Sequence, residues 1–419
     1  MPEPVNLAGK IKERLPDKLV RLLEAIGNIT AHQGRYLYLV GGAVRDLLLE
    51  QETFDLDLVT DGNAIDLAQL LANITQGKLI IHNRFKTANV RWNEWSIDLT
   101  TARSEVYDRP GALPRVKPGS LSDDLFRRDF TINAMAVQLS PGRYGDLIDL
   151  YNGREDLSQG LIHVLHEQSF TDDATRIWRA LRYEQRLGFN LEMETLELLK
   201  RDIAMLDTIS GDRIRHELEL VLKEMRPEKF FLRANQLQVL SQLQPSLKCN
   251  GRLSERFEQA RQVSSPNPPP TGLYLALLTY PLTAEQIEQL VARLRLPRPL
   301  AQILRDTCKL KAEAASLAVA DLKPSRVYRI LHGYAPAALT ALSLATDSPT
   351  TSRNIHQYLA RYRFVKPSLT GEDLKTMGLT PGPRISEILN RLRTARLNGE
   401  VTDRQGEEKL VREWLQEDA

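Results

Sequence analysis

The sequence has little of what marks secreted and membrane proteins. Only two of its 419 residues are cysteines, Cys249 and Cys308, and they lie too far apart to make a metal-binding or redox motif. They are therefore expected to be reduced, structural thiols, which fits the cytoplasm. No apolar run reaches the length of a membrane span, and the first thirty residues lack the apolar core of a signal peptide. The sequence thus predicts a cytoplasmic protein that does not cross a membrane.

An excess of charge of one sign is also lacking, since 56 Lys and Arg face 54 Asp and Glu, for a formal net charge of +2. Any surface for nucleic acid must therefore be a local patch and not a property of the whole molecule. The contents of hydrophobic residues (42%) and charged residues (26%) are those of ordinary globular proteins. A chain of this length exceeds a single hydrophobic core, so about two to four domains are expected.

The apolar pattern predicts an α+β protein, with a mixed sheet and its helices first and helices alone afterwards. Residues 1–34 combine a leader with an amphipathic helix whose apolar face is Leu19, Leu22, Leu23 and Ile26. Residues 35–150 alternate strands with helices such as 64–73. The expected strands are 36–40, 53–59, 78–82, 88–92 and 94–100.

From about residue 151 the chain is expected to be helical, apart from breaks rich in proline at 264–270 and 379–383. The helix after the second break stops at Asn398 and Gly399, a typical helix C-terminus. Its apolar face is Ile385, Ile388, Leu389 and Leu392.

Residues 37–60, LYLVGGAVRDLLLEQETFDLDLVT, carry the strongest pattern in the chain. A buried strand runs into Gly41 and Gly42, where the backbone can turn sharply and approach a ligand with no Cβ in the way. The short helix expected over 43–50 would then point backbone N–H groups at one spot, which suits a phosphate.

Asp55 and Asp57 follow, alternating with the apolar residues 54, 56 and 58. A strand has a period of two, so both carboxylates share one face. Two adjacent acids repel each other unless a divalent cation lies between them, and Mg²⁺ prefers one or two carboxylates plus substrate phosphates. The alternative is an exposed strand edge with solvated acids, but the glycine turn upstream favours a metal site.

Asp98 alternates with Ile97 and Leu99 in the strand 94–100, so it too can project from a polar face. A third carboxylate would complete a two-metal site for nucleotidyl transfer, where one acid helps to remove the proton of an attacking 3′-hydroxyl. The alternative is an ordinary acid at a strand end. The next segment, 100–125, holds three prolines and two glycines and is expected to be a long loop, either a mobile lid or a rigid excursion.

Three other segments carry weaker signals. RRDFTINAMA (127–136) places Arg127, Arg128 and Asp129 before an apolar stretch; arginine suits a triphosphate, although such a triplet alone is usually a solvated turn. DLYNGREDL (149–157) is typical of a turn with helix caps. GDRIRHELELVLKE (211–224) is a charged helix that is expected to pack beneath the site.

The segment TDDATRIWRALRYEQRLGF (171–189) predicts a helix that Thr171 caps and whose first turn carries Asp172 and Asp173. Ala174, Ile177 and Leu181 form its buried seam. A polar stripe recurs every three residues, at Asp173, Arg176, Arg179 and Arg182.

An Asp and an Arg one turn apart offer a hydrogen-bond acceptor and a donor fork to one plane. This pair matches the amino group and ring nitrogen of cytosine or adenine, but not guanine or uracil. The alternative is an exposed helix with salt bridges along it.

In this order, the segments resemble the class II tRNA nucleotidyltransferase family, which comprises CCA-adding enzymes, their CC-only and A-only relatives and bacterial poly(A) polymerases. GGAVRD with DLD is similar to its first motif, RRDFTINAMA to the second, DLYNGREDL to the third, DDATRIWR to the fourth and DRIRHELE to the fifth. The tail from PSLTGEDLKTMG to RTARLNGE resembles the C-terminal element, so the resemblance covers nearly the whole chain. One departure is Asp172-Asp173-Ala174, where the family has Glu-Asp-Pro; the missing proline is expected to loosen the helix start.

The resemblance implies a nucleotidyltransferase head (35–150) after the N-terminal helix (1–34), then a helical neck with the base reader (151–225), a body (226–330) and a tRNA-binding tail (331–419). It implies that Asp55 and Asp57 bind Mg²⁺ and that Asp98 joins them in catalysis. The nucleotide-binding residues would be Gly42, Arg45, Arg128, Asp173, Arg176, Arg179 and Arg182, of which Asp173 and Arg176 read the base. CTP, ATP and the tRNA 3′ end would be the partners, with no obligate protein partner.

The expected activity is addition of C and A to tRNA 3′ ends without a template. A CC-only enzyme, an A-only enzyme and a poly(A) polymerase are alternatives, and the undiminished segment after Asp98 weighs against CC-only addition. A catalytically dead RNA-binding protein and a transferase acting on small molecules are further alternatives. The arginines of the tail, Arg384, Arg391, Arg393 and Arg396, favour an RNA partner.

Overall fold

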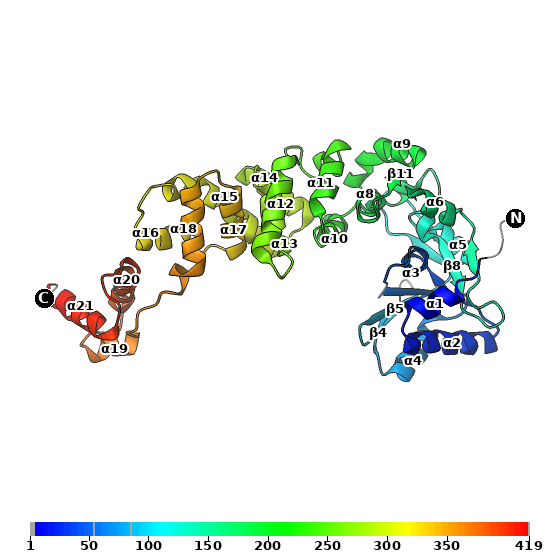
Figure 1. Ribbon diagram of the computed structural model, residues 1–419, viewed down its shortest axis with the longest axis horizontal. Coiled ribbons are helices and arrows are strands. Elements are labelled where there is room, and N and C mark those ends of the chain that lie inside the picture. Colours follow the sequence, from blue (N-terminus) through cyan, green and yellow to red (C-terminus); the bar gives the residue numbers. More distant parts are fainter. Residues whose placement is uncertain (1–4, 53–54, 84–85, 418–419) are drawn as a thin grey trace. The chain divides into compact units, whose positions relative to one another are not determined.

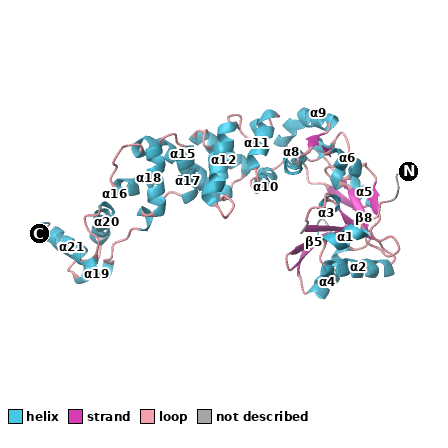
Figure 2. Cartoon of the chain, in the orientation of Figure 1, coloured by secondary structure: helices cyan, strands magenta, loops and turns pink. Residues whose placement is uncertain are grey.

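The computed structural model describes residues 5–52, 55–83 and 86–417, so positions 53 and 54 of the expected strand 53–59 lie outside the described residues. The chain divides into two compact units, Met1–Leu218 and Glu219–Ala419. The elements are labelled in Figure 1, and Figure 2 shows strands in the first unit and helices throughout the second. The predicted α+β class, a mixed sheet followed by helices, is confirmed.

A seven-stranded sheet organises the first unit, in the order β3-β4-β5-β2-β1-β8-β9. Only β2 and β5 pair in parallel; the other neighbours are antiparallel. The strands are β1 (Leu37–Val40), β2 (Asp55–Thr60), β3 (Lys78–His82), β4 (Thr87–Trp92), β5 (Trp95–Thr101), β8 (Met135–Gln138) and β9 (Leu147–Asp149). The sequence did not reveal β8, because an interior strand that is buried at every position shows no alternation.

The N-terminal segment forms two helices, α1 (Ala8–Arg14) and α2 (Asp17–His32), where one was expected. Pro16 separates them, because its ring and missing N–H do not fit inside a helix. The predicted apolar face of α2 is buried. Between the strands lie α3 (Gly42–Leu48), directly after the glycine turn, and α4 (Ala64–Thr75).

The segment 100–125 is not the irregular loop that the sequence predicts. It contains the hairpin of β6 (Arg103–Val106) and β7 (Arg115–Pro118), followed by α5 (Leu121–Phe126). A reciprocal capping box between Ser120 and Asp123 starts α5. The polar strands of this hairpin show no apolar alternation. The prolines and glycines of the segment were therefore the main signal, and they predicted a loop.

The predicted helix from 171 is interrupted. The chain forms α7 (Ser169–Asp172), leaves the helical region at Asp173 (φ −140°, ψ 97°) and resumes in α8 (Thr175–Leu187). Thr171 therefore caps nothing; its hydroxyl donates to Gln168 O. The rest of the first unit is η2 (Thr131–Asn133), α6 (Gly153–Gln159), β10 (Leu161–Ile162), β11 (Asn190–Leu191), α9 (Met193–Asp202), η3 (Ile203–Asp207) and α10 (Gly211–Val221), whose last residues enter the second unit.

The second unit consists of helices in its described residues. They are α11 (Pro227–Gln236), η4 (Leu240–Gln242), α12 (Gly251–Ser264), α13 (Thr271–Thr279), α14 (Ala284–Leu294), α15 (Arg298–Leu317), α16 (Pro324–Leu331), α17 (Pro336–Ala345), α18 (Pro349–Ala360), η5 (Tyr362–Phe364), α19 (Gly371–Thr376), α20 (Pro383–Asn398) and α21 (Arg404–Glu417). The proline-rich break at 264–270 separates α12 from α13, as predicted. Among the described residues, no helix combines the length and apolar character needed to span a membrane.

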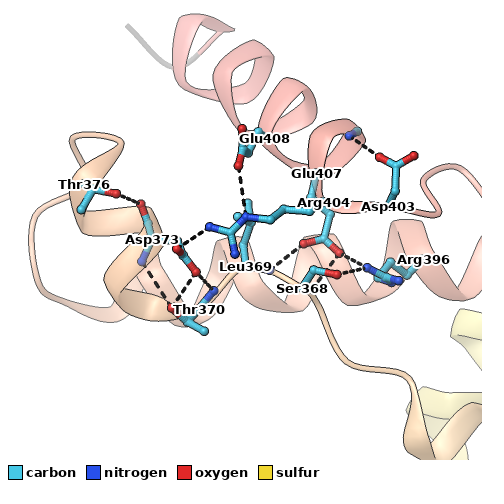
Figure 3. A network of polar contacts seen from close by, with 11 residues as sticks. Ser368, Leu369, Thr370, Asp373, Thr376, Arg396, Asp403, Arg404, Glu407 and Glu408 are labelled. Carbon is cyan, nitrogen blue, oxygen red and sulfur yellow. Dashed lines mark hydrogen bonds and ion pairs between the residues drawn. The ribbon is translucent and has the colours of Figure 1, made fainter.

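The last three helices enclose a core of their own, from Leu369 to Val411. The helix predicted after 383 is confirmed as α20, with Gly399 at its C-cap in the left-handed region. Glu407, whose side chain is fully buried, accepts hydrogen bonds from the backbone N–H groups of Ser368 and Leu369 and pairs with Arg396 (Figure 3). This carboxylate therefore ties both ends of the C-terminal core together.

Candidate active site

The centre of the first unit's sheet carries three carboxylates on neighbouring strands. Asp55 and Asp57 lie two residues apart on β2, and Leu56 and Leu58 between and beyond them are buried, so the two acids share the opposite face. In the parallel pairing of β2 with β5, Asp57 lies beside Asp98. The sheet therefore brings together the three acids that the sequence predicted.

Asp98 is held by a residue that the sequence analysis missed. Asn89, on β4, is the register partner of Asp98, and its Nδ2 donates to Asp98 Oδ1 (3.1 Å) and to Ser96 Oγ (2.8 Å). Burial raises the pKa of Asp98, the Asn89 hydrogen bond opposes that rise, and the charge of Asp55 adds to it. Asn89 could have been found only by pairing β4 with β5, which one strand's sequence does not reveal.

Asp57 lies between a buried environment that disfavours its charge and an arginine that favours it. Burial raises its pKa; Arg128 opposes the rise, whereas the charges of Asp98 and Asp55 add to it. A partly buried carboxylate with two acidic neighbours is stabilised by a bound cation. The donor set thus fits Mg²⁺, a hard cation that accepts carboxylate oxygens.

Asp55 and Asp57 would hold that Mg²⁺. In the described part of the chain, no three His, Cys, Asp or Glu side chains converge closely enough to hold a metal ion. The fit is therefore that of a cation bound by two carboxylates with the remaining ligands from a phosphate-bearing substrate and water.

The glycine turn comes close to Asp57. Gly41 has φ 74°, a conformation that glycine adopts without strain, and a Cβ there would lie 2.5 Å from Arg128 Nη1 and 3.1 Å from Asp57 Oδ2. Gly41, Asp57 and Arg128 therefore lie next to one another. Arg128 and Arg127 are both anchored by Asp124, which is fully buried and was not predicted as a site residue.

Arg45 lies beneath this turn and does not project from it. It is 3% exposed, its Nε and Nη2 donate to Asp46 Oδ1 (2.8 and 2.7 Å), and its Nη1 donates to Asn133 Oδ1 (2.8 Å). A Cβ on Gly42 would lie 3.5 Å from Arg45 Nη2. The structure therefore uses the Arg45 guanidinium to brace the turn from within.

The predicted base reader, Asp173 and Arg176, flanks the break between α7 and α8. Asp173 Oδ1 accepts from Thr175 N (2.9 Å), Thr175 Oγ1 (2.6 Å) and Arg213 Nη2 (2.7 Å). Arg176 is 4% exposed and donates from Nη2 to Arg127 O at 2.8 Å. Its side chain also lines a cavity of about 450 Å³ together with Tyr107, Phe126, His166 and Asp172.

Arg179 and Arg182 face acids. Arg179 Nη2 lies 2.7 Å from Asp129 Oδ2, and Arg182 Nη2 lies 3.6 Å from Glu217 Oε2 on α10. Burial raises the pKa of Asp129, but the Arg179 cation prevails and holds that pKa below its ordinary value. With Arg213 bound to Asp173, the Glu217 contact places α10 against the reader helix, as the sequence predicted.

Two family models match the chain. Residues 37–163 match the poly A polymerase head domain, and residues 188–250 match the probable RNA and SrmB-binding site of polymerase A.

Curated relatives extend the match over nearly the whole chain. An A-adding tRNA nucleotidyltransferase of Halalkalibacterium halodurans is 32% identical over 98% of this chain and 96% of its own length. One of Geobacter sulfurreducens is 34% identical over 98% of this chain but 48% of its own length, so the chain spans about half of that relative. Others are named CC-adding tRNA nucleotidyltransferase and CCA-adding enzyme.

Solved structures agree with these matches. A Thermotoga maritima CCA-adding enzyme complexed with tRNA has a TM-score of 0.79 and 30% identity, covering 99% of this chain and 100% of that one. Structures of a CCA-adding enzyme with ATP and with CTP give TM-scores of 0.83 and 0.82.

Proposed function

Because the chain belongs to the family of class II tRNA nucleotidyltransferases and poly(A) polymerases, we propose that it adds nucleotides to the 3′ end of tRNA without a template. The observation that carries the proposal is the set of Asp55, Asp57 and Asp98 on one sheet face beside the glycine turn. Nucleotidyl transfer needs such acids, because charge develops on both the attacking and the leaving oxygen.

Each residue has a chemical task in this proposal. Asp55 and Asp57 would hold Mg²⁺, which would neutralise charge on the triphosphate and lower the pKa of the attacking hydroxyl. In this proposal Asp98, whose pKa is raised by burial, accepts the proton of the RNA 3′-hydroxyl. Arg128, beside Gly41 and Asp57, and Arg179 contact the phosphates as planar cations.

Asp173 and Arg176 select the base in this proposal. Thr175 N, Thr175 Oγ1 and Arg213 Nη2 all donate to Asp173 Oδ1, which fixes the carboxylate. We propose that Oδ2 accepts from the exocyclic amino group of the nucleotide. A carboxylate acceptor and a guanidinium donor suit cytosine and adenine and disfavour guanine and uracil.

We propose AMP as the nucleotide added. Three relatives that match at least 86% of this chain at 34, 32 and 34% identity are A-adding, whereas the CC-adding relative is 30% identical over 90% of the chain. Addition of the whole CCA sequence is the second candidate, because solved CCA-adding enzymes with ATP and with CTP each align over 99% of this chain.

The proposed partner of the second unit is tRNA. Between residues 322 and 371 the only acid is Asp347, which pairs with Arg252. The cations of this stretch are Lys323, Arg326, Arg329, Arg353, Arg361, Arg363 and Lys366. All seven are exposed, and this local excess of positive charge in a nearly neutral chain supports an RNA partner.

Staged substrates test the proposal. The protein is incubated with Mg²⁺ and each nucleoside triphosphate in turn. The substrates are tRNA that lacks all of CCA, tRNA that ends in its first C and tRNA that ends in CC, and the products are sequenced. Incorporation of AMP only on tRNA ending in CC is the expected result. CMP incorporation on the shorter tRNAs establishes CCA or CC addition instead, long A-runs on unstructured RNA establish a poly(A) polymerase, and no incorporation on any substrate rejects the proposal.

A further inference from the structure

Tyr183, on α8, lies at the centre of the predicted nucleotide-binding arginines. Its ring is 9% exposed, and the guanidinium carbons of Arg45 and Arg182 each lie 5.1 Å from the ring centroid. Phe130 meets the ring edge-on, with centroids 5.9 Å apart and planes at 85°. One tyrosine therefore contacts an arginine of α3 and an arginine of α8.

The partners of these arginines extend the cluster. Arg45 belongs to α3, and it reaches Asn133, which in turn donates to Asp129 Oδ1 (3.0 Å). Asp129 pairs with Arg179 on α8, and Arg182 pairs with Glu217 on α10. The cluster thus links the helix after the glycine turn, the segment 129–133 and the helices α8 and α10.

The aromatic ring of Tyr183 stabilises two buried arginines. Arg45 and Arg182 are 3% and 8% exposed, so their like charges repel with little screening by water. The face of an aromatic ring attracts a guanidinium, most strongly where water is excluded. An aliphatic side chain of similar size would fill the space but would not attract either cation.

We propose that Tyr183 is a positioning residue that fixes α8 against the glycine turn, so that the turn and the α8 arginines engage the same nucleotide. This inference rests on the proposed function, because it assumes that both elements bind one nucleoside triphosphate. In this proposal Tyr183 acts through Arg45 and Arg182 and does not itself contact the substrate.

Three variants of the full-length protein test the proposal. Tyr183→Phe keeps the ring and removes the hydroxyl, and Tyr183→Leu removes both. Tyr358→Leu is the matched control, because Tyr358 is 4% exposed in the core of the second unit and its truncation leaves a comparable cavity. KM for ATP, KM for tRNA ending in CC, kcat and thermal stability are measured for each.

We expect Tyr183→Leu to raise KM for ATP about tenfold, with kcat and KM for tRNA changed much less, because misaligned elements weaken nucleotide binding. Tyr183→Phe, which keeps the ring against both guanidinium groups, should leave KM for ATP close to the wild-type value. Tyr358→Leu should lower thermal stability with KM for ATP unchanged. If Tyr183→Leu lowers only stability and the amount of active protein, with KM for ATP as in the wild type, Tyr183 is merely a core residue and the proposal is overturned.

Failure of the proposed function gives a different result. In that case the wild-type protein incorporates no nucleotide into any tRNA. The Kd for ATP in the presence of Mg²⁺, measured by calorimetry, then replaces KM in the comparison of wild type with Tyr183→Leu. An unchanged Kd overturns the positioning role, and a Kd raised about tenfold supports it.

Discussion

The two units of this molecule use acidic residues in opposite ways. On the β2 and β5 face, Asp57 lies beside Asp98, and burial with two acidic neighbours raises its pKa. In the C-terminal core, Asp373 accepts hydrogen bonds from Thr370 N and Oγ1, and the backbone bond is the first cause of a pKa lowered to about 2 (Figure 3). The first site is left electrostatically unbalanced and the second is fully compensated, which separates acids kept for chemistry from acids kept for structure.

The largest expected effect comes from breaking the first site. Asp55→Ala or Asp57→Ala should lower kcat for nucleotide addition on the order of 1000-fold or more, because several kcal/mol of charge stabilisation depend on the metal ligands. Single-turnover incorporation of labelled nucleotide measures the loss. Asp66→Ala, an exposed acid of α4, serves as the control and should retain wild-type kcat. Activity surviving in both Asp55→Ala and Asp57→Ala would remove the metal-site assignment.

Breaking the contacts of another compensated acid of the second unit, Glu407, should affect stability and leave catalysis intact. Glu407→Gln leaves the partly exposed Arg396 guanidinium without its counter-charge and weakens a buried acceptor of hydrogen bonds, which costs about 1–3 kcal/mol. Hydrogen exchange of α19, α20 and α21 measures this cost locally. Glu413→Gln, at an exposed site, should cost less than about 0.5 kcal/mol. Equal protection in Glu407→Gln and wild type would show that the pair is not structural.

Asp57→Asn should change thermal stability in the opposite direction from Glu407→Gln. The raised pKa of Asp57 means that its ionised form destabilises the fold in the absence of metal, a penalty that grows as pH rises from the unfolded pKa through the folded one. Asp57→Asn should therefore raise thermal stability above that pH while abolishing activity. Melting curves in chelator at pH 3 and pH 8 test this: the variants should differ at pH 8 alone. A lower melting temperature for Asp57→Asn at pH 8 would contradict it.

The smallest expected effect concerns Asn89. Asn89→Ala removes one hydrogen bond to Asp98, worth about 1 kcal/mol, so kcat should fall about fivefold. Single-turnover rates at saturating Mg²⁺ and nucleotide measure this change. Asn93→Ala, in the turn between β4 and β5, provides a nearby control. A rate equal to wild type would mean that Asp98 does not need this partner.

Local sequence patterns predicted that the three acids and the glycine turn lie together. The alternation around Asp55 and Asp57 and the glycine turn before them are properties of neighbouring residues, so strand period and backbone freedom sufficed to find them. The roles of Arg45 and Arg182 could not be derived in the same way. Their burial against Tyr183, Asn133 and Glu217 depends on contacts between distant segments, and the arginine stripe gave no sign that it is largely buried.

In the fold, too, elements with a local sequence pattern were predictable, and elements defined by contacts between distant segments were not. Helices with a clear apolar face, such as α2 and α20, were predictable from their periodicity. The strand β8 was not, because its burial at every position erases the alternation that identifies a strand. The hairpin of β6 and β7 was missed because its pairing, and not the apolar content of either strand, defines it.

The parallel pairing of β2 with β5 has a consequence for how the protein acquires activity as it is made. Antiparallel neighbours can join through a short turn, but Asp57 and Asp98 become adjacent only after the chain has formed α4, β3 and β4 and folded back. During synthesis, Asp55 and Asp57 are therefore made before Asp98, which lies about forty residues further along the chain. The acids become adjacent when β5 pairs with β2, and β8 and β9, which complete the sheet, follow later in the chain.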